Sequence, residues 1–234
     1  ALGQGAEMGD SGMYGFPVTT LSGLSISAFA GLSSAQAAVL RTEHIASLSE
    51  SQIGAFSPQA IRGLGAGMFS MLSSAQVAAL STAQVVGLSP QQIGALTTEA
   101  IAGLSESAIL RLSSTQLSGW SMGQIRALSS EQVSGLTATQ VGAMTPDQIR
   151  GFEGADPMSY IYPPYHGSGG NLVGLSTSAI AGLSSAQVSV LRSEQVASLS
   201  TGQFAAINAL SIKGLQTAQV AVLSSDQLAA LTTK

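Results

Sequence analysis

Residues 73–88 read Ser-Ser-Ala-Gln-Val-Ala-Ala-Leu and then Ser-Thr-Ala-Gln-Val-Val-Gly-Leu. Both octapeptides fit the pattern (S/T)-x-x-Q-(V/I)-x-(G/A)-L, and we number each octad from 1 to 8 so that its large apolar residue is position 8. Working outward, the pattern extends over 17 octads in residues 17–152 and over 8 octads in residues 168–231, with no insertion inside either block. Repetition at a fixed short period is the signature of a repeat architecture.

Neither one long helix nor a strand fits this period. Eight residues of α-helix advance about 800°, so the apolar stripe would drift by roughly 80° in each octad and never form a face. In a strand, positions 5 and 8 would point to opposite sides. We therefore expect the chain to turn once in every octad.

The start of each octad has the signals of a helix N-terminus. Position 1 is Ser or Thr in 19 of the 25 octads and position 4 is Gln in 15. This recurring pair predicts a capping box at the start of the octad. In a capping box each of the two side chains bonds the backbone N–H of the other residue. Pro58, Pro90 and Pro146 lie at position 2, the first helical residue, where proline is tolerated best.

The charged residues agree with helices that start at position 1. Basic residues within octads lie at position 6 or 7, or at position 1 of the following octad. Acidic residues lie only at positions 2 and 3: Glu43, Glu50, Glu99, Glu106, Glu131, Asp147, Glu194 and Asp226. Acids at the start and bases at the end are the arrangement that the helix dipole favours.

We therefore predict an all-α solenoid, a superhelix of short capped helices with one helix in each eight-residue repeat. Ordering eight residues costs about 12 kcal/mol, and two buried apolar side chains contribute only ~3–6 kcal/mol, so octads must stack around a shared core of positions 5 and 8. Ala or Ser replaces Gln at position 4 in two pairs of octads 32 residues apart, at Ala28 and Ala60 and at Ala179 and Ser211. This spacing suggests four octads in each superhelical turn.

Two longer segments lie outside the octads. The predicted organisation is an N-terminal extension (1–16), a solenoid (17–152), a Tyr/Pro-rich insert loop (153–167), a second solenoid (168–231) and a C-terminal end (232–234). Loops on a regular scaffold often carry function, and aromatic side chains often anchor interfaces. The candidate interface residues are therefore Met13, Tyr14, Phe16, Tyr160, Tyr162, Tyr165 and His166. Docking of the insert onto its own solenoid is the alternative for the tyrosines.

Composition excludes several classes of function. Charged residues are 9% of the chain and the net charge is −4, so there is no basic stripe for nucleic acid. The absence of Cys excludes disulfides and thiolate chemistry. No apolar run approaches the 18 or more residues of a membrane span. The chain begins at Ala1 rather than Met, so we expect it to be processed or excerpted, and a cleaved secretory signal would explain this start.

Few single residues suggest chemistry. His44 occupies position 4, where it is expected to cap in place of Gln, and His166 lacks a second His or a carboxylate cluster with which to bind a metal. Glu153 and Asp156 could contact a cation but are expected to be solvated. Trp120, at position 8, is expected in the core. We predict no enzyme activity, no catalytic residue, no metal and no cofactor.

The phrases Leu-Ser-Thr-Ala-Gln-Val at 80–85 and Leu-Thr-Ala-Thr-Gln-Val at 136–141 resemble the L-(S/T)-x-x-Q-(V/I) octapeptide arrays of large secreted or surface proteins of Gram-negative bacteria, which are described as adhesin-like. The resemblance covers all 25 octads. It implies a secreted or cell-surface repeat protein.

Two functional hypotheses follow. The first is a secreted structural protein that binds copies of itself, end to end or side by side, in a filament, sheath or surface array, with residues 1–16 or 153–167 joining neighbours. The second is a monomeric spacer or binding module of a large bacterial adhesin, in which the insert binds a surface ligand.

Overall fold

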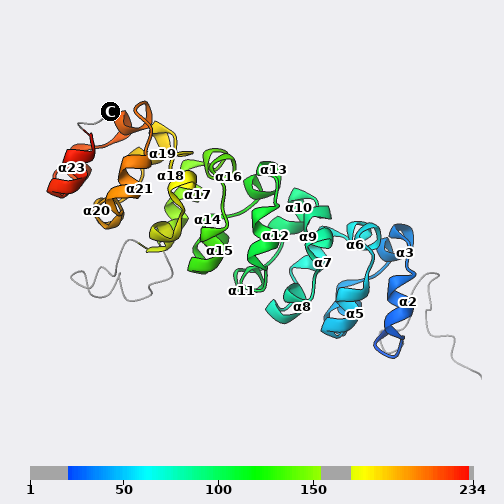
Figure 1. The fold of residues 1–234 in the computed structure, drawn as a ribbon. Helices are drawn as coiled ribbons and strands as arrows, with labels where there is room; N and C mark the ends of the chain where they lie inside the picture. Colours follow the sequence, from blue (N-terminus) through cyan, green and yellow to red (C-terminus); the bar gives the residue numbers. More distant parts are fainter. Residues whose placement is uncertain (1–20, 154–169, 232–234) are drawn as a thin grey trace, which may run out of the picture.

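The structure is a computed structural model, and it describes residues 21–153 and 170–231. Each octad from residue 25 onward within these ranges forms one short helix, in most cases of four to seven residues, that begins after position 1. The chain is an elongated row of such helices, running from α2 at one end to α23 at the other (Figure 1). The predicted fold class, an all-α solenoid with one capped helix per octad, is confirmed.

The helices stack in three columns, because each helix packs on the helix three octads further along the chain. The first column contains α2 (Ile26–Ala30), α5 (Glu50–Ala55), α8 (Ser74–Ala78), α11 (Thr98–Ile101), α14 (Met122–Arg126), α17 (Pro146–Arg150) with the 3₁₀ helix η1 (Gly151–Glu153), α19 (Ser185–Ser189) and the 3₁₀ helix η3 (Ser211–Gly214).

The second column contains α3 (Ser34–Ala38), α6 (Pro58–Gly63), α9 (Thr82–Gly87), α12 (Glu106–Leu110), α15 (Ser130–Ser134), the 3₁₀ helix η2 (Gly170–Gly174), α20 (Ser193–Ser198) and α22 (Thr217–Val220). The third contains α4 (Thr42–Ala46), α7 (Ala66–Phe69), α10 (Pro90–Gly94), α13 (Ser114–Ser118), α16 (Ala138–Gly142), α18 (Thr177–Ile180), α21 (Thr201–Ala206) and α23 (Ser225–Leu231).

The superhelical turn therefore has three octads, and the suggestion of four octads per turn is wrong. The 32-residue spacing of Ala and Ser at position 4 does not measure the turn. Two of these octads show what it accompanies: Ala60 and Ala179 share their octads with Gly63 and Gly182. A Cβ atom on either glycine would lie about 2 Å from a carbonyl oxygen in the helix beneath, Ser34 O at 2.1 Å or Ala138 O at 2.2 Å. These octads pack backbone against backbone.

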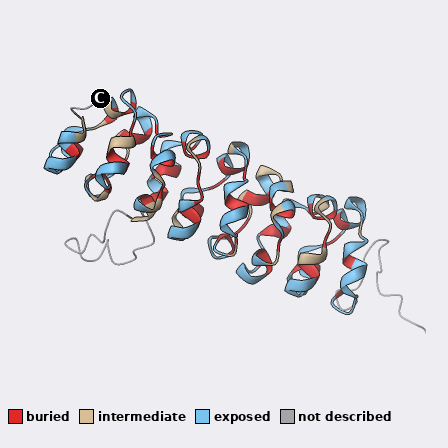
Figure 2. Cartoon of the chain, viewed as in Figure 1, coloured by how far each residue is buried: buried red, intermediate tan, exposed pale blue. Residues whose placement is uncertain are grey.

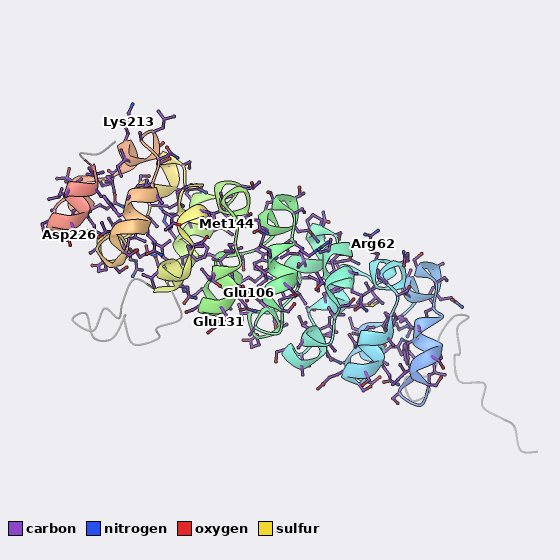
Figure 3. All side chains as sticks on the ribbon, viewed as in Figure 1. Arg62, Glu106, Glu131, Met144, Lys213 and Asp226 are labelled. Carbon is purple, nitrogen blue, oxygen red and sulfur yellow. The ribbon has the colours of Figure 1, made fainter. Side chains whose placement is uncertain are left out.

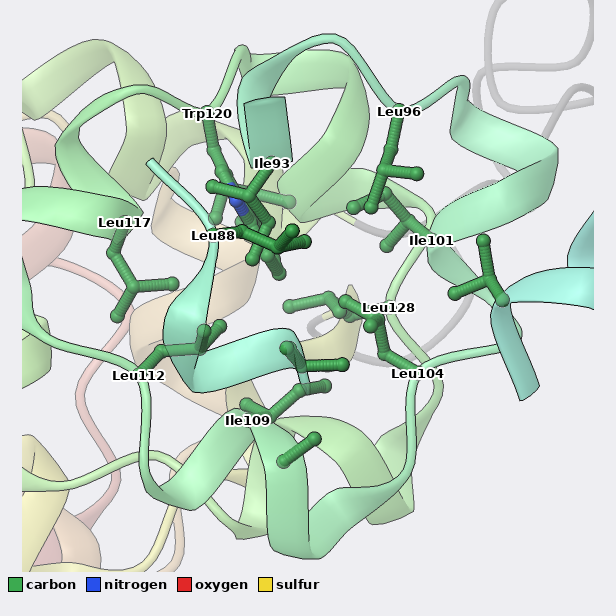
Figure 4. Close-up of a cluster of buried hydrophobic side chains, with 14 of the residues drawn as sticks. Leu88, Ile93, Leu96, Ile101, Leu104, Ile109, Leu112, Leu117, Trp120 and Leu128 are labelled. Carbon is green, nitrogen blue, oxygen red and sulfur yellow. The ribbon is translucent and has the colours of Figure 1, made fainter. Parts of the chain in front are cut away.

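The hydrophobic core lies between the three columns of helices, on their inward-facing sides (Figure 2). Position 5 is at most 1% exposed in every octad from Phe29 to Phe204, and Leu88, Ile93, Leu96, Ile101 and Trp120 meet in the interior (Figure 4). Trp120 is 3% exposed, so its predicted core position is confirmed. The labelled charged side chains Arg62, Glu131, Lys213 and Asp226 lie at the outer edge of the ribbon (Figure 3).

Position 5 packs toward the following turn of the solenoid and position 8 toward the preceding one. The first turn shows the pairing directly: the ring of Phe29, at position 5, lies 5.4 Å from the ring of Phe56, at position 8 three octads later. Each interface between turns therefore has two different sides, and the solenoid is polar along its axis.

Candidate functional site

The side chain at position 4 joins successive turns as well as capping its own helix. Gln76 Oε1 accepts from the backbone N–H of Ser73 at 2.9 Å, and the Gln76 N–H donates to Ser73 Oγ at 3.1 Å, which is the predicted capping box. Gln76 Nε2 then donates to the carbonyl oxygens of Leu48, at 2.8 Å, and Ile45, at 3.4 Å. One buried amide thus satisfies an N-terminal donor of its own helix and C-terminal acceptors one turn back, groups that a helix cannot satisfy by itself.

This 28-residue relationship recurs along the solenoid, and we call the series the glutamine ladder. Its Nε2-to-O distances at position 8 span 2.6–3.0 Å. The donors are Gln52, Gln76, Gln84, Gln92, Gln116, Gln124, Gln132, Gln140, Gln148, Gln203, Gln219 and Gln227. A signal for the ladder exists in the sequence, because Glu would cap equally well yet never occupies position 4.

In two octads a residue other than Gln lies at position 4 and makes either a capping bond or a bond to the preceding turn. His44 is 3% exposed, and its Nδ1 accepts from the backbone N–H of Arg41 at 3.0 Å, so the predicted capping role is confirmed. Ser211 Oγ donates to Leu183 O, again 28 residues earlier.

The ladder continues across the insert. Asn171 Nδ2 donates to Leu128 O at 2.5 Å and Gln187 Nε2 to Met144 O at 2.7 Å, with 43 residues between the partners in each pair. The extra 15 residues equal the length of the segment 153–167. The octads on either side of the insert therefore stack as if they were consecutive.

Glu153, the first residue of the insert and the only one of it that the structure describes, forms an ion-pair cluster with arginines from two octads. Its Oε2 lies 3.2 Å from Arg126 Nη2 and 2.8 Å from Arg192 Nη2, and its side chain is 14% exposed. The expectation that Glu153 is solvated or contacts a cation is therefore wrong: the positive charge beside it comes from two arginines. Asp156 lies outside the described residues.

This same region contains two buried donors with no acceptor among the described residues, Arg126 Nε and Gln195 Nε2. By the rule of the ladder, Gln195 would donate to Phe152 O. Gly170 (φ 61°) lies close to this oxygen, since a Cβ on it would clash with Phe152 O. The ladder therefore crosses the insert at Asn171 and Gln187 but lacks the bond from Gln195. We call this region around Glu153, Gly170 and Gln195 the seam at the insert.

The two ends of the described solenoid expose different parts of the interface between turns. At the C-terminal end, position 5 becomes exposed, to 46% at Val220 and 45% at Leu228. At the N-terminal end, position 8 is exposed instead, to 41% at Leu24, while Phe29 stays buried. These two surfaces, which we call the forward face and the backward face, are exposed apolar features of the described residues that the sequence pattern alone did not reveal.

The predicted interface residues lie outside the described part of the chain: Met13, Tyr14, Phe16, Tyr160, Tyr162, Tyr165 and His166. Within residues 21–153 and 170–231, no three His, Cys, Asp or Glu side chains come together in a way that could hold a metal ion. None of the helices described combines the length and apolar character needed to cross a membrane.

The stacked, capped octads define the class of this chain, an all-α repeat solenoid. The model of the ALTTAQ repeat family matches residues 69–98, 121–152, 170–201 and 199–233, which together make up more than half of the chain. The chain belongs to the ALTTAQ repeat family. A comparison with curated proteins found no match.

Proposed function

We propose that this chain is a structural repeat protein that binds further copies of itself, end to end or side by side, building an extracellular filament, sheath or surface array. The observation that carries the proposal is the regular stack of octads, whose repeated side chains cap the helices, fill the core and join the turns, as Ser73, Gln76 and Val77 do. A solenoid built in this way is an elongated scaffold in which each repeat contacts its neighbours.

The outer surface supports this function. With 9% charged residues and a net charge of −4, copies approach one another against little electrostatic repulsion. The hydroxyl and amide groups of the octads act in capping and in the ladder, so the repeated residues serve structure and leave no repeated catalytic group. We accordingly propose a non-enzymatic protein that works outside the cell or on its surface.

The experiment is negative-stain electron microscopy of the 234-residue chain purified without denaturant, together with its mass by sedimentation equilibrium over a range of concentrations. Regular filaments or sheets, with a mass that rises with concentration, are the expected result. A constant mass of 23.5 kDa at every concentration would refute assembly. Deleting residues 1–16 or 154–167 then tests whether either segment joins neighbouring copies.

A second function, a monomeric spacer or binding module of a large bacterial adhesin, is favoured by the seam at the insert. Glu153 ties the start of the insert to Arg126 and Arg192 while the columns continue past it, so the solenoid fixes the residue from which the insert continues. This function predicts a stable monomer. Retention on immobilised glycans or matrix proteins should then be lost when Tyr160, Tyr162 and Tyr165 are replaced by Ser, and an unchanged retention would refute it.

A further inference from the structure

The guanidinium of Arg62 is held against the next turn of the solenoid, at the outer edge of the second column (Figure 3). Arg62 lies at position 6, near the end of α6, and its Nε donates to Gly87 O at the end of α9 across 2.7 Å. A Cβ on Gly87 would lie 2.9 Å from this Nε, so the glycine leaves the space that the guanidinium occupies. The Nε bond restrains the plane of the guanidinium and leaves its two Nη groups for other partners.

Arg62 has no acidic partner in the part of the chain that the structure describes. The arginines with a carboxylate within ion-pair distance there are Arg41, Arg126, Arg150 and Arg192. The Nη groups of Arg62 also make no hydrogen bond to any described residue, since its one bond is made by Nε. Arginine stays charged and presents its N–H groups as a planar fork that matches a carboxylate. Arg62 is therefore an oriented donor that lacks an acceptor from residues 21–153 and 170–231.

A surface hollow of about 450 Å³ lies beside this guanidinium, and we call it the Arg62 groove. Its wall is formed by Arg62, Leu64, Ala66, Gly87, Ser89 and Gln92. Small-molecule sites usually have volumes of about 300–1,000 Å³, so the groove has the size for a small molecule and not merely for an ion. The amide of Gln92 is already used, because its Nε2 donates to Leu64 O at 2.7 Å. A ligand in the groove therefore meets one fixed positive charge, that of Arg62.

An equivalent arginine at the insert has a carboxylate in the corresponding place. Arg126 is also at position 6, and Glu153 follows it by 27 residues, as Ser89 follows Arg62. Both Glu153 and Ser89 come directly after position 8 of the octad that stacks on the helix of the arginine. Arg126 Nη2 lies 3.2 Å from Glu153 Oε2. The chain thus shows that a carboxylate in this place binds a position 6 arginine, whereas at Arg62 the place belongs to a serine.

We propose that the Arg62 groove binds a small molecule that carries one carboxylate, which accepts from the Nη groups of Arg62 as Glu153 does from Arg126. The bond from Arg62 Nε to Gly87 O orients the fork in advance, which lowers the cost of ordering it when the ligand binds. A polyanion is disfavoured because the wall contains no second cation and the chain has a net charge of −4. The groove lies within a single copy, so its binding does not depend on assembly.

The probe is sodium D-glucuronate, a sugar acid with a single carboxylate, and neutral D-glucose is its matched control. Saturation-transfer difference NMR with the 234-residue chain measures the binding of both, and it applies to monomers and to assemblies alike. We expect saturable binding of glucuronate with a dissociation constant in the millimolar range, and no saturable binding of glucose at the same concentrations. A parent chain that does not bind glucuronate, or that binds glucose equally well, overturns the proposal.

Two substitutions of Arg62 test the donor. Arg62→Gln removes the charged fork and should weaken glucuronate binding at least about tenfold. Arg62→Lys keeps the charge but not the planar pair of N–H groups, and it should also bind more weakly than the parent. Arg111→Gln makes the same charge change at an exposed arginine outside the groove and should bind like the parent. An affinity that is unchanged in Arg62→Gln, or that falls equally in Arg111→Gln, overturns the site.

A substitution of Ser89 tests where the carboxylate lies. Ser89→Glu should place a carboxylate of the chain itself on Arg62, as Glu153 lies on Arg126, and thereby abolish glucuronate binding. It also removes the hydroxyl that accepts from the Gln92 N–H at 3.1 Å. Ser89→Ala loses the same cap without adding a carboxylate, so it is the matched control and should bind glucuronate like the parent. With helix content verified by circular dichroism, binding that persists in Ser89→Glu or is lost in Ser89→Ala overturns the placement.

Discussion

Gln76 and Leu48 lie 28 residues apart, and Gln76 Nε2 donates to Leu48 O across 2.8 Å. The same amide caps its own helix through Oε1. A single side chain therefore couples the start of one helix to the end of another in the previous turn. Because a repeat solenoid depends on contacts between neighbouring turns, this residue contributes to cooperativity along the whole array.

The first prediction concerns the donor half of this amide. Gln132→Glu keeps an oxygen for the N–H of Ser129 but replaces the buried Nε2 donor beside Leu104 O with a charged oxygen. We expect a loss of about 2–4 kcal/mol in the free energy of unfolding, because buried acceptors lose their partner and a negative charge is buried against them. Urea denaturation followed by circular dichroism measures it. Gln36→Glu, at an exposed glutamine, is the control in dilute monomer and should change stability by less than ~0.5 kcal/mol.

A second prediction follows from the close approach of two backbones. Gly63→Ala places a Cβ 2.1 Å from Ser34 O, so α6 must move away from α3. We expect a loss of about 1–3 kcal/mol. Gly67→Ala, where nothing lies within 4 Å of the new Cβ, should instead stabilise the protein by roughly 0.5–1 kcal/mol because alanine favours the helix. Equal effects of the two substitutions on the thermal midpoint would contradict the close packing at Gly63.

The sequence predicts the helix inside each octad, but it does not predict how helices of different octads pack. Capping boxes at residues such as Ser73 and Gln76 are local, so the pattern of one octad predicts the helix and its start. The number of octads per turn depends on how helices from different octads pack. Substitutions at Ala28 and Ala60 do not report this packing, which is why four octads were expected where three are found.

The candidate site was predictable in part. His44 and Trp120 have the roles that their octad positions predict. The ion pairs of Glu153 were missed because Arg126 and Arg192 are 27 and 39 residues away along the chain. The polarity of the two end faces was missed because positions 5 and 8 are both apolar in the sequence. Only the packing of Phe29 on Phe56 distinguishes them.

The third prediction concerns the cluster at the insert. Glu153→Gln removes the charge that Arg126 and Arg192 share, and Glu153 is only 14% exposed. We expect a loss of about 1 kcal/mol, more at low salt than at high salt, and faster limited proteolysis between α17 and α18. Asp147→Asn removes an exposed pair with Arg150 and serves as the control, with an expected change below ~0.5 kcal/mol. If both variants are cleaved at the parent's rate, Glu153 does not hold the insert in place.

The last prediction concerns acidic pH. A hydrogen bond from its own backbone N–H, at the start of α11, holds the pKa of the Glu99 carboxyl below its ordinary value of 4.5, and the hydroxyls of Thr98 and Thr97 lower it further. The pKa of Glu43 and of Glu131 is lowered by the same kind of backbone bond. Since the folded pKa is below the unfolded one, the stabilising contribution is complete above pH 4.5 and is lost as the pH falls through the folded pKa.

The variant that isolates this contribution is Glu99→Gln, because glutamine has no proton to gain in the acidic range. The difference in thermal midpoint between the parent chain and Glu99→Gln should be constant above about pH 5 and should shrink as the pH falls below about 4.5 and the parent's carboxylate is protonated. Thr98→Val, which removes one of the hydroxyl donors to Glu99, should shift this change to higher pH. A midpoint difference that stays constant down to pH 3 would show that the helix start does not stabilise the Glu99 carboxylate.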